Sequence, residues 1–330
     1  MKFQLAGTFC LLAILISMWH MTAHIRQFKR PFVQRKILAI LWMSPIYAVT
    51  SWLSLVFPKF EGYLGIIKDF YEAYVIYQFL GFCISVLGKG DREKVVDLLA
   101  HHSDHLDPPI RCCGCFRGAH PTISPRELAG AVLMQCQIFA MQFVFLRPLV
   151  SVGLFTCQKT DLCTVPDVND HDHVVVFGLV PLHVLKDPIV WLRIVQNISV
   201  FMAFSGLLKF YHAAQDDLAW CNPFPKFLCI KGIVFMTFWQ GLVISFLAKT
   251  TNSEAPPSNN ENEDDPDLWA KQAQNFLICL EMLLFSIAHF YCFPTDEWQD
   301  GYRPIMEKRV KGLDNMAFGD FMADLKLIMR

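Results

Sequence analysis

Long apolar runs separated by short polar stretches dominate the pattern of this chain. Seven runs reach the roughly 17–25 residues that a helix needs to cross a hydrocarbon core of about 30 Å. Helices are favoured because a spanning segment must satisfy its own backbone hydrogen bonds, and the runs lack the short polar–apolar alternation of barrel strands. The pattern predicts an all-α bundle with spans at residues 3–19, 37–57, 70–88, 128–150, 189–208, 227–247 and 270–290.

The first run also has features of a secretory signal peptide, because Lys2 precedes its apolar stretch. The run ends, however, in Trp19 and a basic segment, without the small residues of a cleavage site. We therefore expect a retained transmembrane helix.

Positive charges between the runs are distributed unevenly. One set of alternate loops, with the tail, holds nineteen Lys and Arg residues, whereas the other set holds six. Because loops rich in Lys and Arg stay in the cytoplasm, we expect the N-terminus outside and the C-terminus inside. This gives one polytopic membrane domain over residues 1–295 and a cytoplasmic tail over residues 296–330.

Composition excludes several classes of protein. With 54% hydrophobic and 18% charged residues, the chain is too apolar for a soluble domain of 330 residues. Its net charge of -1 argues against a nucleic-acid partner. We find no phosphate-binding glycine loop, nucleophile elbow or metalloprotease helix motif in the sequence, so we expect no enzyme, no cofactor and no metal site.

Three cysteines, Cys112, Cys113 and Cys115, lie together in a predicted cytoplasmic loop between Arg111 and Arg117. Clustered thiols beside basic and aromatic residues near a membrane favour S-acylation, such as palmitoylation, which would hold the loop at the inner leaflet. Inert cysteines are one alternative. Zinc is another, although its sites usually have four ligands in spaced pairs.

Two further cysteines, Cys157 and Cys163, fall in the predicted outer loop after the fourth span. An oxidising compartment would permit a disulfide between them, and two free thiols are the alternative.

Polar residues within spans are costly in lipid and usually face the bundle interior. Counting along the helices brings Glu72, Arg147 and Arg193 to a similar outer depth. Such a cluster could bind an anionic group, or it could be a structural ion pair that locks three helices. Asn197 shares a helix face with Arg193, and Glu281 lies near the middle of the last span, where it is either a functional residue or a hydrogen-bonded strut.

Several co-linear motifs resemble the organic solute transporter alpha-subunit and transmembrane protein 184 family. The similarity extends over about residues 5–295 and includes the cysteine cluster. Its other motifs lie at residues 24–26, 34–37, 44–48, 51–55, 71–77, 146–148, 196–199, 226–228, 238–240 and 274–282. The chain departs from the family pattern in a shorter cysteine run, a long outer loop after the fourth span and a tail without an extended disordered region.

The resemblance implies a seven-helix fold that moves amphipathic organic solutes such as steroid-like or bile-acid-like anions. In the transporter branch it also implies a single-span beta-type partner subunit, whereas other members are linked to vesicle trafficking and signalling. A non-transporting seven-helix receptor or trafficking protein is therefore the alternative function. The sequence leaves a homo-oligomer open, and a plasma-membrane or an endosomal or vacuolar location fits equally well.

For a transporter, the sequence favours facilitated diffusion, because it has no nucleotide-binding motif and no pair of broken helices typical of sodium sites. The solute would contact membrane lipids and a polar groove formed by the third, fifth, sixth and seventh spans. The predicted solute contacts are Glu72, Arg147, Arg193, Asn197, Gln240, Asn275 and Glu281.

Overall fold

In the computed structural model, the described residues are 2–101, 124–160, 175–176, 180–181, 188–230, 232–233, 236, 240, 243–244, 266–298 and 318–329. Within them the protein is helical apart from one antiparallel pair of two-residue strands, β1 (Val175–Val176) and β2 (Val180–Pro181).

The helices differ in length and fall into three groups. The long ones are α1 (Lys2–Arg26), α4 (Glu61–Gly88), α6 (Pro125–Thr160), α7 (Pro188–Leu218) and α9 (Pro266–Cys292). The short ones are α2 (Pro31–Leu41), α3 (Met43–Val56), α5 (Arg92–His101) and α10 (Phe318–Ile328), with the 3-10 turns η1 (Pro58–Phe60), η4 (Ala219–Cys221) and η5 (Thr295–Trp298). Residues 223–230, 232–233, 236, 240 and 243–244 are also helical, and we call them the 223–244 segment.

Six helices in the described part of the chain are long and apolar enough to cross a membrane. They are Lys2–Arg26, Pro31–Val56, Pro58–Gly88, Pro125–Cys157, Pro188–Cys221 and Trp269–Trp298, and each overlaps one predicted span. The remaining predicted span, 227–247, falls on the interrupted 223–244 segment. The protein is therefore a helical multi-pass membrane protein, and the count of seven and the orientation stay predictions.

Local sequence explains where these helices begin and where the chain turns. Ser124 and Glu127 form a capping box at the start of α6, with each side chain accepting the other residue's backbone N–H at 3.4 and 3.2 Å. After α4 the chain turns at Gly90, whose φ of 87° suits glycine. The Phe32 ring packs against this turn, so that an added Cβ on Gly90 would lie 3.1 Å from it.

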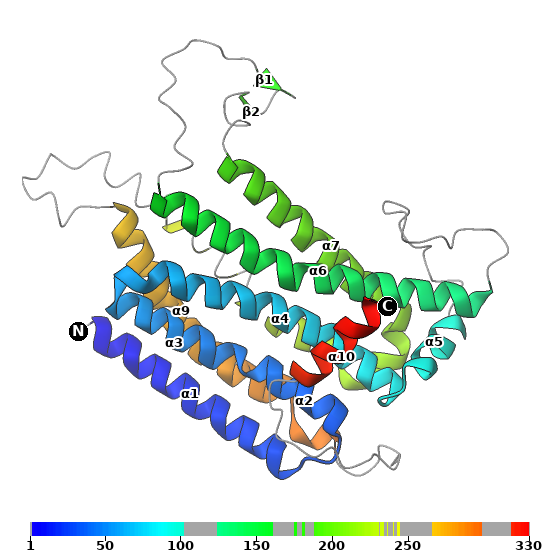
Figure 1. The fold of residues 1–330 in the computed structure, drawn as a ribbon. Helices are drawn as coiled ribbons and strands as arrows, with labels where there is room; N and C mark the ends of the chain where they lie inside the picture. The colour runs from blue at the N-terminus through cyan, green and yellow to red at the C-terminus, as the bar shows by residue number, and fades with distance from the viewer. Residues whose placement is uncertain are drawn as a thin grey trace, which may run out of the picture.

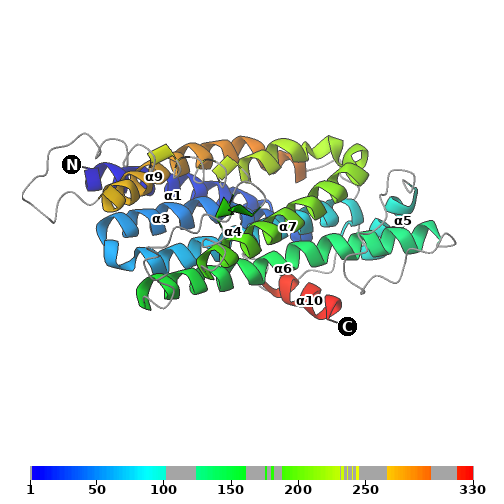
Figure 2. The ribbon, with the colours of Figure 1, turned by 90° about the horizontal axis from the view of Figure 1, so that it is seen from above.

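The long helices run side by side in one bundle (Figure 1). α9 packs on α1 and α3, α4 packs on α2, α3 and α6, and α6 packs on α7. Figure 2 shows α1 and α9 on one side of the bundle and α6 and α7 on the other. We use the predicted orientation to name its ends: the outer end holds the starts of α1, α4, α7 and α9, and the inner end holds the starts of α2 and α6.

Burial differs sharply between the central and the peripheral helices. In the most apolar stretch of each helix, 83% of the α4 residues are buried inside the protein, compared with 17% in α7. α4 is therefore the core of the bundle, whereas most of α7 has to face lipid or another molecule. α7 comes very close to α6 at Gly206, where an added Cβ would lie 3.1 Å from Phe139 and 3.4 Å from the Cys136 backbone.

The predicted cytoplasmic tail contains a further helix, α10, which packs against the bundle. Phe321 is buried and lies in edge-to-face contact with Tyr74 and Tyr77 of α4 and near Phe145 of α6. The apolar runs of the sequence do not predict this contact, because the tail lies beyond them. In Figure 1, α10 lies across α4 near the inner end of the bundle.

Replacing Gly206 by valine should destabilise the protein by about 1–3 kcal/mol, because the new side chain forces α6 and α7 apart. We expect a lower apparent Tm in detergent, measured by thermal unfolding of the purified chain. Gly65→Val is the matched control, since no heavy atom lies within 4 Å of a Cβ built there. Equal Tm values for the two variants would contradict the close packing of these helices.

Candidate functional site

A cluster of charged and hydroxyl side chains joins α3, α4 and α6 in the outer half of the bundle. Arg147 Nη2 lies 2.8 Å from Asp69 Oδ1 and 3.3 Å from Glu72 Oε2. The Tyr47 hydroxyl donates to Glu72 at 3.3 Å, and the Ser151 hydroxyl donates to Asp69. We call these five residues the arginine cluster.

The charge balance of the arginine cluster opposes anion binding. One guanidinium faces two carboxylates, so the formal charge is −1, and the Arg147 side chain is only 16% exposed. A further anion would have to compete with two charges that are already in contact. Of the two alternatives for Arg147 and Glu72, the geometry therefore favours the structural ion pair.

Asp69 was missing from the predicted cluster because it lies just outside the predicted third span. The signal that could have found it is its spacing from Glu72, since residues i and i+3 share a helix face.

Arg193 and Asn197 lie apart from the arginine cluster. Both are exposed on α7, one helical turn from each other, and no ion pair of Arg193 is found within the described residues. The adjacent Leu192 packs against Gly153 of α6, six residues beyond Arg147. Since Gly153 lies about 9 Å beyond Arg147 along α6, this contact separates Arg193 from the arginine cluster.

Two amide side chains fix how α7 and the 223–244 segment meet their neighbours. Gln142 of α6 donates to the Ser199 carbonyl at 2.9 Å and accepts from the Ser199 hydroxyl at 2.7 Å. Gln240 turns its amide nitrogen toward Glu281 of α9. In this orientation the nitrogen donates to the two carboxylate oxygens of Glu281 at 3.0 and 3.2 Å. Gln240 and Glu281, both predicted solute contacts, are therefore neighbours.

Asn275, another predicted contact, is buried between α9 and the outer part of α4. Its amide oxygen accepts from Lys68 Nζ at 3.2 Å, and its amide nitrogen donates to Glu61 at 3.2 Å. Lys271 lies 3.8 Å from the same Glu61 carboxylate. These contacts make Asn275 a bridge between two helices.

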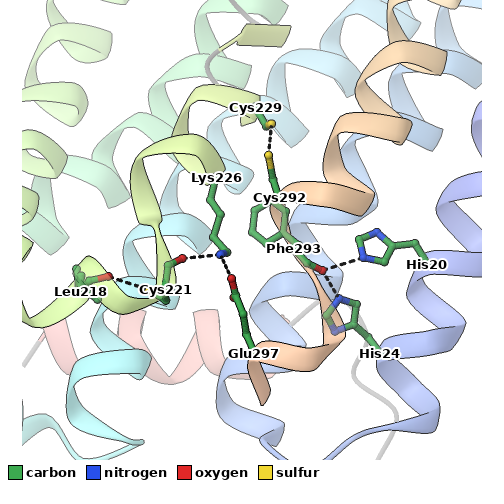
Figure 3. Close-up of polar contacts among 9 residues, drawn as sticks. All are labelled: His20, His24, Leu218, Cys221, Lys226, Cys229, Cys292, Phe293 and Glu297. Carbon is green, nitrogen blue, oxygen red and sulfur yellow. Dashed lines mark hydrogen bonds and ion pairs between the residues drawn. The ribbon is translucent and has the colours of Figure 1, made fainter. Parts of the chain in front are cut away.

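A second polar cluster, which sequence analysis did not predict, occupies the inner end of the bundle (Figure 3). His20 and His24 of α1 both donate from Nε2 to the Phe293 carbonyl, at 2.9 Å each. This carbonyl lies just past the end of α9, where no further helical turn can satisfy it. The four-residue spacing of the two histidines, which follow the first predicted span, was the available signal.

The other half of the inner cluster joins the 223–244 segment to the end of α9. Lys226 Nζ lies 2.8 Å from Glu297 and also donates to the Cys221 carbonyl, while the Cys229 and Cys292 sulfurs are 3.1 Å apart (Figure 3). No group of three His, Cys, Asp or Glu side chains suited to a metal occurs in the part of the chain that the structure describes. The inner cluster therefore resembles a set of helix-joining contacts.

The cysteine predictions fall mainly outside the described residues. Cys112, Cys113 and Cys115 lie there, as does Cys163. Cys157, at the outer end of α6, is disulfide-bonded. Its pairing with Cys163 stays a prediction.

Replacing Arg147 by glutamine should lower stability by about 3 kcal/mol, because Asp69 and Glu72 lose their counter-charge. The apparent Tm in detergent should fall, and adding Asp69→Asn should restore part of it. Arg193→Gln, the same change at an exposed position, should leave Tm unaltered. A wild-type Tm for Arg147→Gln would contradict the structural role.

Comparison with known proteins identifies a family whose model covers most of this chain. The family model described as organic solute transporter Ostalpha matches residues 3–298, which is nearly the whole membrane-embedded part of the chain. No solved structure matches the chain. Because the match covers well over half of its length, this integral membrane protein belongs to the organic solute transporter Ostalpha family.

Proposed function

We propose that this protein is a facilitative transporter of amphipathic organic anions, of steroid-like or bile-acid-like chemistry. Membership of a solute transporter family supports transport as such. The sequence has no nucleotide-binding motif to couple transport to ATP, which supports facilitated diffusion. The steroid-like or bile-acid-like class follows from the family resemblance, and the exposed surface of α7 supports an amphipathic anion.

The observation that carries the proposal is a charged residue on a lipid-facing helix. Arg193 and Asn197 lie among exposed apolar side chains of α7, including Trp191 at 53% and Ile198 at 55% exposure. An arginine near hydrocarbon costs a few kcal/mol unless something compensates its charge. An amphipathic anion does so, because its acidic group pairs with Arg193 while its apolar body covers the neighbouring side chains.

Arg193 is a better anion contact than Arg147, for an electrostatic reason. Arg147 already faces two carboxylates in the arginine cluster. Arg193 has no ion pair among the described residues, so none of their carboxylates competes there with an incoming anion. Glu72 and Asn275 then act in the scaffold that supports α7.

Two further polar groups, away from α7, are also assigned to the solute route in this proposal. Gln240 and Glu281 form a hydrogen-bonded pair between the 223–244 segment and α9. Hydroxyl groups on a steroid-like solute can exchange hydrogen bonds with this pair as the solute passes. A single-span beta-type partner fits the same proposal, because a second transmembrane helix could cover the exposed remainder of α7.

The cysteine cluster completes the proposal on the cytoplasmic side. Acyl chains on Cys112, Cys113 and Cys115 would anchor their loop to the inner leaflet, since stable anchoring needs more than one lipid signal. The protein then acts at the plasma membrane or an endosomal or vacuolar membrane.

Uptake of a radiolabelled steroid sulfate or bile acid into vesicles holding the purified chain, with and without candidate single-span partners, tests transport. Arg193→Gln should lower uptake about tenfold, the effect of losing roughly 1.4 kcal/mol of binding. The matched control is Lys271→Gln, which removes an exposed cation from α9.

Surface expression of each variant should stay normal. Absence of flux across a broad anion panel with every partner would refute transport and favour a receptor or trafficking role. Normal uptake by Arg193→Gln would remove Arg193 from the solute route.

Acylation has its own test. Hydroxylamine-sensitive acyl exchange should label the wild-type chain and fall sharply when Cys112, Cys113 and Cys115 become serine. Cys136→Ala, at a buried position on α6, is the control and should keep the label. An unchanged signal in the triple variant would rule out acylation of this cluster.

A further inference from the structure

A cavity of about 330 Å³ lies at the inner end of the bundle, between α2, α4, the start of α5, α6 and α10. It is remote from Arg193, which lies near the outer end of α7. Its apolar wall includes Leu80 and Ile84 of α4 and Leu327 of α10. Its polar lining includes Lys36, Tyr77, Arg92, Gln137 and Asp324.

The cationic side of this cavity is built by three helices. Lys36 of α2 is buried, and its side chain crosses α4 at Gly81, where an added Cβ would lie 3.1 Å from Nζ. Arg92, at the start of α5, donates to Gln137 of α6 at 2.8 Å. The two cations are therefore held on the cavity by packing and by a hydrogen bond.

α10 places an acidic side chain at the same cavity and packs apolar side chains on the bundle beside it. Its Asp324 Oδ2 accepts from the Tyr77 hydroxyl at 2.7 Å. One turn earlier, Phe321 packs its ring on Tyr74 and Tyr77. Leu325 and Ile328 pack on the core of the bundle. This combination of a carboxylate and a hydrophobic body is the chemistry of an amphipathic anion.

α10 also has the character of a helix at a membrane surface. Its outward side chains Met322 and Met329 are 50% and 79% exposed. Apolar side chains on both sides of a short helix with three charged residues suit the boundary between the headgroups and the acyl chains. Such a helix can leave the bundle and remain on the membrane, which makes its release inexpensive.

We propose that this cavity is a binding site for the acidic end of an amphipathic anion, and that Asp324 of α10 occupies the site as a built-in competitor. The size fits this role, because about 330 Å³ is at the lower end of the roughly 300–1,000 Å³ of small-molecule pockets. The cavity therefore holds the acidic group of a ligand and the part next to it. The remainder of the ligand lies against α4, in the place that α10 occupies when it is docked.

Charge explains why α10 and a ligand exclude each other. With α10 docked, Lys36 and Arg92 are balanced by Asp91 and Asp324. When α10 leaves, Asp324 goes with it and the cavity gains one net positive charge. Asp91 stays, but its carboxylate caps the Glu93 N–H at 3.1 Å and pairs with Lys94 at 3.6 Å.

The ligand class rests on the proposed function, and an anionic lipid has the same chemistry as a transported solute. The experiment therefore uses the purified full-length chain in phosphatidylcholine nanodiscs and measures binding of a tritiated steroid monosulfate. Asp324→Asn should raise the affinity about three- to tenfold, because the competing charge is lost while the packing of Phe321 is kept. Adding Arg92→Gln to Asp324→Asn should abolish the gain.

Two controls test for nonspecific charge effects. Lys326→Gln changes an exposed residue on the same helix, and Glu93→Gln removes an exposed acid from α5. Both should bind like wild type. Equal affinities for wild type and Asp324→Asn would overturn the proposal, as would an equal gain in Glu93→Gln.

Release of α10 provides a second readout. A fluorescent amino acid at Met329 should change its emission when the sulfate binds, and an unchanged emission at saturation would overturn the proposal. Nanodiscs that contain phosphatidate without the sulfate form the other arm: a change there assigns the site to a lipid headgroup, and a change with the sulfate alone assigns it to a solute. This experiment measures binding and not flux. A negative result would therefore refute the cavity site without refuting transport, and a positive result would support the site even if the uptake experiment showed no transport.

Discussion

A polar group within a bilayer needs a partner, and this requirement determines how the helices of this protein are aligned. Apolar side chains provide contact area between helices but little information about register, since lipid is as apolar as they are. The register of α4 against α6 comes from Arg147 and its two carboxylates. Gln142 sets the register of α6 against α7 through its two hydrogen bonds with Ser199.

The same requirement operates at the inner end of α9, where the chain leaves the helix. There two histidines of α1 supply the donors that the Phe293 carbonyl no longer finds in its own backbone. Lys226 and Glu297 join the 223–244 segment to the same region. The bundle is thus held by polar contacts at several depths, and these contacts join several different pairs of helices.

Sequence reasoning located the helices better than it located their contacts. Runs of apolar residues are long, so six predicted spans lie in helices that meet the length and hydropathy requirements. Depth along a helix follows from the rise per residue, and this placed Glu72 near Arg147. Rotation about the axis and the tilt of each helix depend on packing, which is why Arg193 was grouped with them although it lies on the exposed side of α7.

The unanticipated elements share a physical origin. Asp69 lies at the edge of an apolar run, and His20 lies just beyond one, so hydropathy treats both as loop residues. α10 is too short to span and follows a polar stretch, so nothing in its hydropathy predicts that Phe321 is buried between α4 and α6. Such contacts depend on surfaces that exist only once the bundle has formed.

The exposure of α7 has a consequence for how a solute would encounter the protein. A surface that opens sideways into the bilayer samples molecules at their concentration in the membrane, which for hydrophobic compounds greatly exceeds that in water. Two solutes with the same acidic group would then differ in apparent affinity by their partition coefficients, even with identical contacts at Arg193. The lipid composition around α7 would act as part of the protein's selectivity.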